Sequence, residues 1–88
     1  MKLKYEFAVR EIIGEYVMVP LGAGALEFSG MISTSETGAT LAGALKNHVS
    51  RQELLSLLVE QYEIDEATAT EDLDEFLQQL KNLDLLIE

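Results

Sequence analysis

The spacing of apolar residues changes once along this chain, near residue 33, and this change constrains the fold more than any other feature. Before it, apolar and polar residues alternate in short runs broken by glycine and proline, a pattern typical of β-strands. After it, apolar residues recur every three or four positions, as on one face of a helix. A chain of 88 residues builds one modest core, so we expect a single domain over residues 1–88.

Three strands are predicted in the first part of the chain. The first covers residues 5–12 and the second residues 16–19, where β-branched and aromatic side chains gather. The third is expected over residues 25–33, whose side chains alternate between two faces and include one charge, Glu27. Short glycine-containing connections predict an antiparallel meander whose edges are the first and third strands.

The two predicted edges differ in charge. Charged residues discourage pairing at the first strand, in the form of Lys4, Glu6, Arg10 and Glu11. The third strand has no comparable protection. We therefore expect the third strand to be the edge that another chain can reach.

The second part of the chain predicts three helices. The first begins after Ser33 or Ser35, either of which could cap it, and is rich in glycine and alanine. Ser50 and Glu53 form a capping box for the second helix, and Asp65 is the expected cap of the third. The buried face of the third helix is predicted to comprise Ala69, Leu73, Phe76, Leu77 and Leu80. These elements predict an α+β fold: a three-stranded antiparallel sheet followed by a winged-helix-like three-helix bundle.

The charge of the chain argues against nucleic acid as a partner. The formal net charge is −10, and residues 45–88 hold eleven acidic side chains against three basic ones. Only six lysines and arginines are available to replace counterions on phosphate, so a basic peptide is a more natural ligand. The first residues lack the apolar core of a signal peptide, and no apolar run suits a membrane span. We therefore expect a cytoplasmic protein without a membrane partner.

Residues with catalytic potential have no suitable neighbours in the sequence. His48 is the only histidine, cysteine is absent, and the capping positions of Ser33, Ser35 and Ser50 explain these serines better than a nucleophilic role. We expect no enzymatic activity, no metal and no cofactor. An acidic cluster in the third helix is either a solvated face or a patch for lysine or arginine of a partner; it comprises Glu71, Asp72, Asp74 and Glu75.

Several segments, taken in their order and spacing, match a known family. They are residues 9–12, 14–20, 28–32, 35–39, 53–54, 62–64, 72–73, 76–77, 80 and 85–87. Through them the chain resembles the PqqD-like family, the small RiPP recognition elements that act as chaperones for precursor peptides. Two positions depart from the family pattern. Ser35 stands where asparagine is common, and Ala42 lies where members tend to place a bulky aromatic, so the packing of the first helix is expected to differ.

The resemblance implies an adaptor without catalytic activity. Such proteins bind the leader of a ribosomally made precursor and present it to a modifying enzyme, often a radical SAM enzyme, as in the biosynthesis of PQQ. The leader is expected to add as a strand to the third strand, beside the third helix. The implied peptide-binding residues are Glu27, Phe28, Ser29, Gly30, Met31, Asp72, Leu73, Phe76 and Gln79.

Periodicity leaves open which residues of the third helix face this groove and which face the core. The open edge could also be covered in a homodimer. Alternative functions are a winged-helix transcriptional regulator or a protein-protein interaction module, and the acidic helices argue against the first of these.

Overall fold

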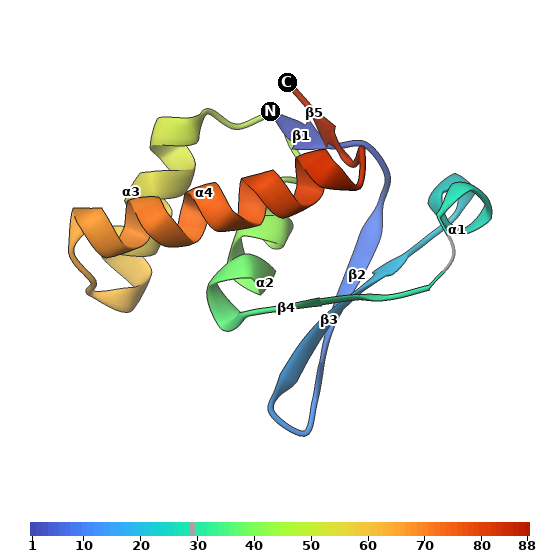
Figure 1. Ribbon diagram of the computed structural model, residues 1–88, viewed down its shortest axis with the longest axis horizontal. Coiled ribbons are helices and arrows are strands. Elements are labelled where there is room, and N and C mark those ends of the chain that lie inside the picture. The colour runs from blue at the N-terminus through green and yellow to red at the C-terminus, as the bar shows by residue number, and fades with distance from the viewer. Residues whose placement is uncertain (29) are drawn as a thin grey trace.

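The computed structural model of the protein describes residues 1–28 and 30–88. In chain order its elements are β1 (Lys2–Leu3), β2 (Phe7–Ile12), β3 (Glu15–Pro20), α1 (Ala23–Glu27), β4 (Ile32–Thr34), α2 (Glu36–Ala44), α3 (Arg51–Tyr62), α4 (Glu66–Asn82) and β5 (Leu86–Ile87). Helices α2, α3 and α4 lie together, and the β2–β3 hairpin extends beyond them (Figure 1). The predicted α+β class is confirmed, with a second small sheet and a short helix added.

The main sheet is antiparallel with the order β2-β3-β4, so β2 and β4 form its two edges as predicted. A two-residue turn joins β2 to β3, and both of its residues have positive φ, 50° at Ile13 and 79° at Gly14. This turn matches the right-handed twist of the two strands. It fixes the register of the hairpin, in which Ile12 lies opposite Glu15.

The core lies between the sheet and the helices. Met18 of β3 and Ile32 of β4 meet Leu41 of α2, and all three side chains are at most 5% exposed. The predicted apolar face of α4 is buried along its whole length, which confirms the period of 3.6 residues; it consists of Ala69, Leu73, Phe76, Leu77 and Leu80. Helix α4 is thereby held against the rest of the core.

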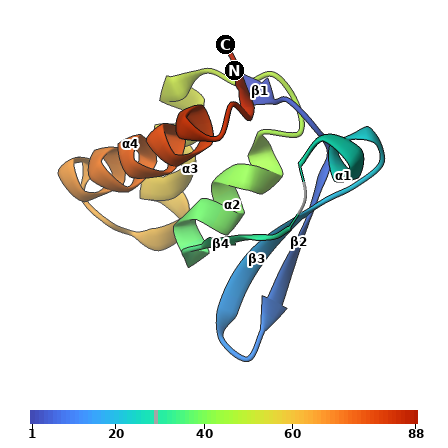
Figure 2. The ribbon, with the colours of Figure 1, turned by 45° about the vertical axis from the view of Figure 1, so that its right-hand side comes forward.

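The ends of the chain pair with each other, which periodicity did not predict. Strand β1 pairs antiparallel with β5, so that Lys2 lies opposite Ile87 and Leu3 opposite Leu86. The two termini lie side by side in both views (Figures 1 and 2). This pairing closes the end of the bundle that is distant from the β2–β3 turn.

The strand predicted over residues 25–33 is wrong in its extent. Residues Ala23–Glu27 form helix α1 instead, and the strand is confined to Ile32–Thr34. Gly22, with φ 56°, turns the chain after β3. Gly24 then lies so close to Tyr5 that an added Cβ would come within 2.7 Å of the tyrosine Cβ. Leu26, which the alternating pattern assigned to one face of a strand, is 89% exposed on this helix.

The predicted helix caps are confirmed. Ser35, and not Ser33, caps α2 by accepting a hydrogen bond from the Gly38 N–H. Ser50 and Glu53 form the complete capping box of α3, and Asp65 accepts from Thr68 at the start of α4. Within the described residues, no helix combines the length and hydropathy that crossing a membrane requires.

Candidate functional site

The open edge of β4 presents the backbone of Ser33. The Leu21 N–H donates to the Glu6 carbonyl at 2.9 Å, so Glu6 and Leu21 form a hydrogen-bonded pair at the end of the β2–β3 ladder. In an antiparallel ladder, successive residues of a strand direct their backbone N–H and C=O groups alternately to its two sides. Counted from Leu21, which faces β2, Tyr16 and Met18 of β3 direct theirs toward β4. Their partners there are Thr34 and Ile32, and the residue between them faces the opposite way. Ser33 therefore directs its N–H and C=O away from the sheet.

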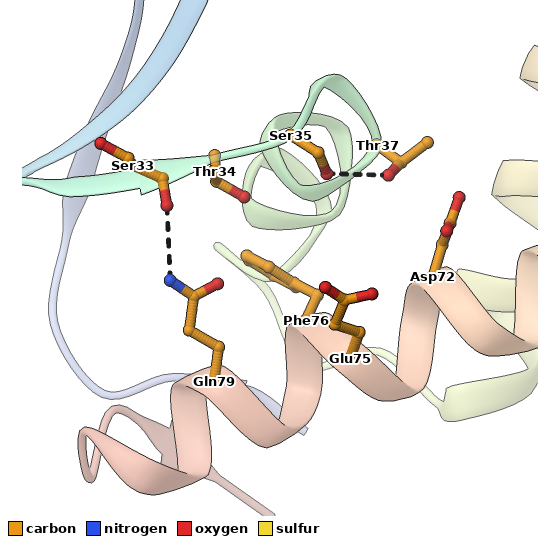
Figure 3. Close-up of a pocket in the computed structure, with 8 residues that line it drawn as sticks. All are labelled: Ser33, Thr34, Ser35, Thr37, Asp72, Glu75, Phe76 and Gln79. Carbon is orange, nitrogen blue, oxygen red and sulfur yellow. Dashed lines mark hydrogen bonds between the residues drawn. The ribbon is translucent and has the colours of Figure 1, made fainter.

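A cavity of about 420 Å³ lies beside this edge, between β4, the first turn of α2 and helix α4. Figure 3 shows side chains from all three elements converging on it. Its walls are Ser33, Thr34, Ser35, Thr37, Asp72, Glu75, Phe76 and Gln79. The cavity thus combines an unpaired strand edge with the side of a helix.

The floor of the cavity is set by a close contact between α2, β4 and α4. Phe76 belongs to the apolar face of α4 and is only 4% exposed. A Cβ added to Gly38 would clash with the Thr34 hydroxyl and would lie 3.1 Å from the Phe76 ring. Because glycine has no side chain here, the first turn of α2 can approach both β4 and α4.

Polar side chains of α4 form the wall opposite β4. Asp72, Glu75 and Gln79 follow the helical spacing of three and four residues, so they lie on one side of α4 next to its buried face. The Gln79 side-chain amide spans the cavity and donates to the Ser33 carbonyl at 3.3 Å (Figure 3). One atom of the open edge is therefore already hydrogen-bonded from within the chain.

The cavity is acidic. The ion pairs among the described residues join Lys4 to Asp84, Arg51 to Asp74 and Lys81 to Glu88. Of the acidic cluster in α4, only Asp74 takes part in one of these pairs. The two carboxylates on the cavity wall thus remain free to attract a cationic ligand.

Two of the hydroxyl groups in the cavity, those of Ser35 and Thr37, serve the fold. Ser35 caps α2 through its Oγ, which also lies 3.0 Å from the Thr37 Oγ1. His48 is exposed in the segment before α3. In the part of the chain that the structure describes, no three potential metal ligands come together. The site therefore offers hydrogen bonds, charge and an apolar floor to a ligand.

The predicted binding residues that the structure describes separate into three groups. Asp72, Phe76 and Gln79 line the cavity, whereas Leu73 is 0% exposed in the core. Four others, Glu27, Phe28, Gly30 and Met31, lie at the end of α1 or between α1 and β4. The predicted residue Ser29 lies outside the described residues.

Five residues of the cavity were missing from the predicted set: Ser33, Thr34, Ser35, Thr37 and Glu75. Two signals in the sequence could have found them. The run of three hydroxyl residues at 33–35 marks the junction between the strand and the helix. Glu75, three residues after Asp72, belongs on the same side of α4.

Comparison with known proteins gives one family and one related fold. The family model for coenzyme PQQ synthesis protein D (PqqD) matches residues 15–86. Among solved structures, "TbiB1 in Complex with the TbiA(beta) Leader Peptide" is similar to this chain with a TM-score of 0.68 and 24% sequence identity. The similarity covers 98% of this chain and 94% of that one, and it supports the fold. Among curated proteins, none matches this chain.

Proposed function

Because the chain belongs to the PqqD family, we propose that it is a non-catalytic adaptor that binds the leader of a ribosomally made precursor peptide. The leader would add as a strand to the open edge of β4 and lie against α4. The related structure was determined with a leader peptide bound to TbiB1, which supports a ligand of the same class here. On this proposal, residues 1–88 act as one peptide-binding domain.

One observation carries the proposal: the outward-facing backbone of Ser33 lies beside a cavity with an apolar floor. A peptide in extended conformation could exchange backbone hydrogen bonds with Ser33 and extend the sheet. Because side chains alternate along a strand, every second side chain of such a peptide would face α4, on the side where Phe76 lies. Backbone pairing supplies affinity in this mode, and the pockets for alternate side chains supply specificity.

The acidic wall favours a leader with a basic residue near this position. Asp72 and Glu75 flank the floor of the cavity, and the chain as a whole carries a net charge of −10. Complementary charge speeds encounter and selects among peptides more than it adds raw affinity. We therefore propose that lysine or arginine of the leader lies against this wall.

A modifying enzyme completes the proposed role. The adaptor would present its peptide to a radical SAM enzyme or another peptide-modifying enzyme, in the biosynthesis of PQQ or a related peptide product. Such a role would place the protein in the cytoplasm, where ribosomal precursors are made. The test is joint purification of this protein with any peptide-modifying enzyme encoded near its gene, with and without any short precursor peptide encoded there.

A second copy of the chain is another candidate occupant of the β4 edge. Edge-to-edge pairing of two β4 strands would give a homodimer in which both peptide sites are covered. Leader binding would then compete with self-association. Sedimentation at increasing peptide concentration distinguishes the cases, since dimers of this kind dissociate as peptide is added.

The direct test of the proposal is selection of ligands from a displayed library of random peptides. We expect enriched sequences with alternating apolar residues and at least one lysine or arginine. Titration of the isotope-labelled protein with the best synthetic peptide should shift the amide resonances of residues 32–35 and 72–79. Failure to enrich any sequence, or shifts confined to other segments, would reject the proposed site.

A further inference from the structure

The hydrogen bond between Gln79 and Ser33 lies at the position that an added strand would need. Ser33 is the residue of β4 whose carbonyl faces away from β3. That carbonyl accepts a hydrogen bond from the Gln79 Nε2 at 3.3 Å. The bond joins the helix to the strand, so the glutamine amide lies directly against the outward carbonyl of Ser33 (Figure 3).

The side-chain amide of glutamine reproduces the donor that a peptide strand would supply. Both are amide N–H groups, and both direct a hydrogen toward a backbone carbonyl oxygen. A strand that pairs with Ser33 through its backbone N–H must therefore replace the amide of Gln79 or crowd against it. The side chain can move aside, because it is only partly buried and extends from the rigid helix α4.

We propose that Gln79 guards the β4 edge by occupying the Ser33 carbonyl until a leader displaces it. This inference rests on the proposed function and deepens it, because it assigns Gln79 a competing role and not a contact with the bound peptide. Edge strands are commonly protected by charges of their own, which β4 lacks. Here the protection comes from a neighbouring helix and is removable. Only segments whose contacts outweigh the lost hydrogen bond gain access.

If Gln79 protects the β4 edge in this way, removal of its side-chain amide should strengthen peptide binding. Gln79→Ala leaves the Ser33 carbonyl open, so a peptide enriched on the wild-type protein from the displayed library should bind about two- to tenfold more tightly. Gln79→Met retains the length of the side chain without the donor and should fall between the two. Gln78→Ala is the matched control, since Gln78 is adjacent on α4 but hydrogen-bonds to Asn82 outside the cavity.

Calorimetric titration of these four proteins decides the inference. A wild-type protein that binds the peptide while Gln79→Ala binds equally or more weakly would overturn the guard and leave the proposed function intact. If no peptide is enriched at all, the proposed function fails, and the guard is judged on the free protein. There, the side-chain amide protons of Gln79 should exchange with water more slowly than those of Gln61, an exposed residue of α3. Equal exchange would contradict the guard without any peptide.

Discussion

The two edges of the main sheet are protected in different ways. Strand β2 is six residues long and carries exposed charges, Arg10 and Glu11, in its own sequence. Strand β4 is three residues long and has none, but the side chain of Gln79 reaches its outward carbonyl from α4. The first kind of protection is permanent, whereas the second can be moved aside. On the proposed function, this difference makes β4 the edge at which a ligand adds.

The largest expected effect comes from a substitution at the close contact between α2, β4 and α4. In Gly38→Ala, the added Cβ meets the Thr34 hydroxyl and the Phe76 ring, so the structure must shift. We expect a loss of about 1 to 3 kcal/mol in the free energy of unfolding, measured by chemical denaturation. Gly43→Ala is the matched control in the same helix, since an added Cβ there meets nothing within 4 Å. It should stabilise the protein by about 0.5 to 1 kcal/mol. Equal effects of the two variants would contradict the close contact at the cavity floor.

The next effect compares the two edges directly with proline. Ser33→Pro removes the outward N–H of β4, and we expect peptide affinity to fall about tenfold. Proline is tolerated where the lost N–H faces away from the sheet. By the same alternation Glu11 faces outward on β2, so Glu11→Pro is the matched control and should leave affinity unchanged. Circular dichroism of both variants checks that each is folded. If Glu11→Pro lowers peptide affinity more than Ser33→Pro does, the peptide binds at the β2 edge instead.

A smaller effect is expected from the acidic wall. Asp72→Asn together with Glu75→Gln should weaken binding of a lysine-containing peptide by about two- to fivefold per charge, and should reduce the dependence of affinity on salt. Two matched control substitutions are Glu71→Gln and Glu60→Gln, which change the net charge equally on residues outside the cavity walls. Affinity measured at low and at high ionic strength distinguishes a local contact with the acidic wall from the long-range attraction of the whole net charge. An equal loss in the control pair would show that only net charge matters.

The smallest effect concerns acid and the helix that forms the wall. Hydrogen bonds from the Thr68 backbone hold the pKa of Asp65 below its ordinary value of 3.8, and those with Ser50 hold the pKa of Glu53 below 4.5. Groups with a depressed folded pKa stabilise the protein above their unfolded pKa, and this contribution is lost as the pH falls through the folded value. The melting temperature should therefore fall on acidification from about pH 7 to about pH 3.

The acid effect is tested by neutral residues that retain the caps. Asp65→Asn and Glu53→Gln can still hydrogen-bond at the same helix starts, so the combined variant should lose part of the acid dependence while keeping its helices. Glu60→Gln, an exposed residue of α3 that caps no helix, serves as the control. If the melting temperature of the combined variant depends on pH as in the wild-type protein, the capping carboxylates do not cause the acid effect.

The helical part of the fold was predictable because its signals are local. Ser50, Glu53 and Asp65 cap helices through hydrogen bonds that span three residues, and the buried face of α4 follows from its period. The third strand was not predictable in extent. Residues 25–27 alternate like a strand, but the turn at Gly22 and the close approach of Gly24 to Tyr5 place them in a helix. The approach of Gly24 to Tyr5 joins distant segments and leaves no pattern in the sequence.

The candidate site was partly predictable for the same reasons. Helical spacing places Asp72, Phe76 and Gln79 on the side of α4 that lines the cavity, and their contact with a peptide stays a prediction. The sequence placed Leu73 both on the buried face and among the peptide-binding residues, and its exposure of 0% shows that it belongs to the core. The predicted strand began too early in the chain: the observed strand is Ile32–Thr34, and Ser33 is its residue whose backbone faces the open edge. The pairing of β1 with β5 depends on contacts between the two ends of the chain, which short alternating runs cannot indicate.

The central claim, that a peptide pairs with β4 and not with β2, is tested most directly by amide hydrogen exchange in the presence of a library-selected peptide. The account predicts that the Ser33 N–H becomes protected when peptide is added, while the Glu11 N–H on the opposite edge exchanges at its former rate. Protection at Glu11 with no change at Ser33 would contradict it.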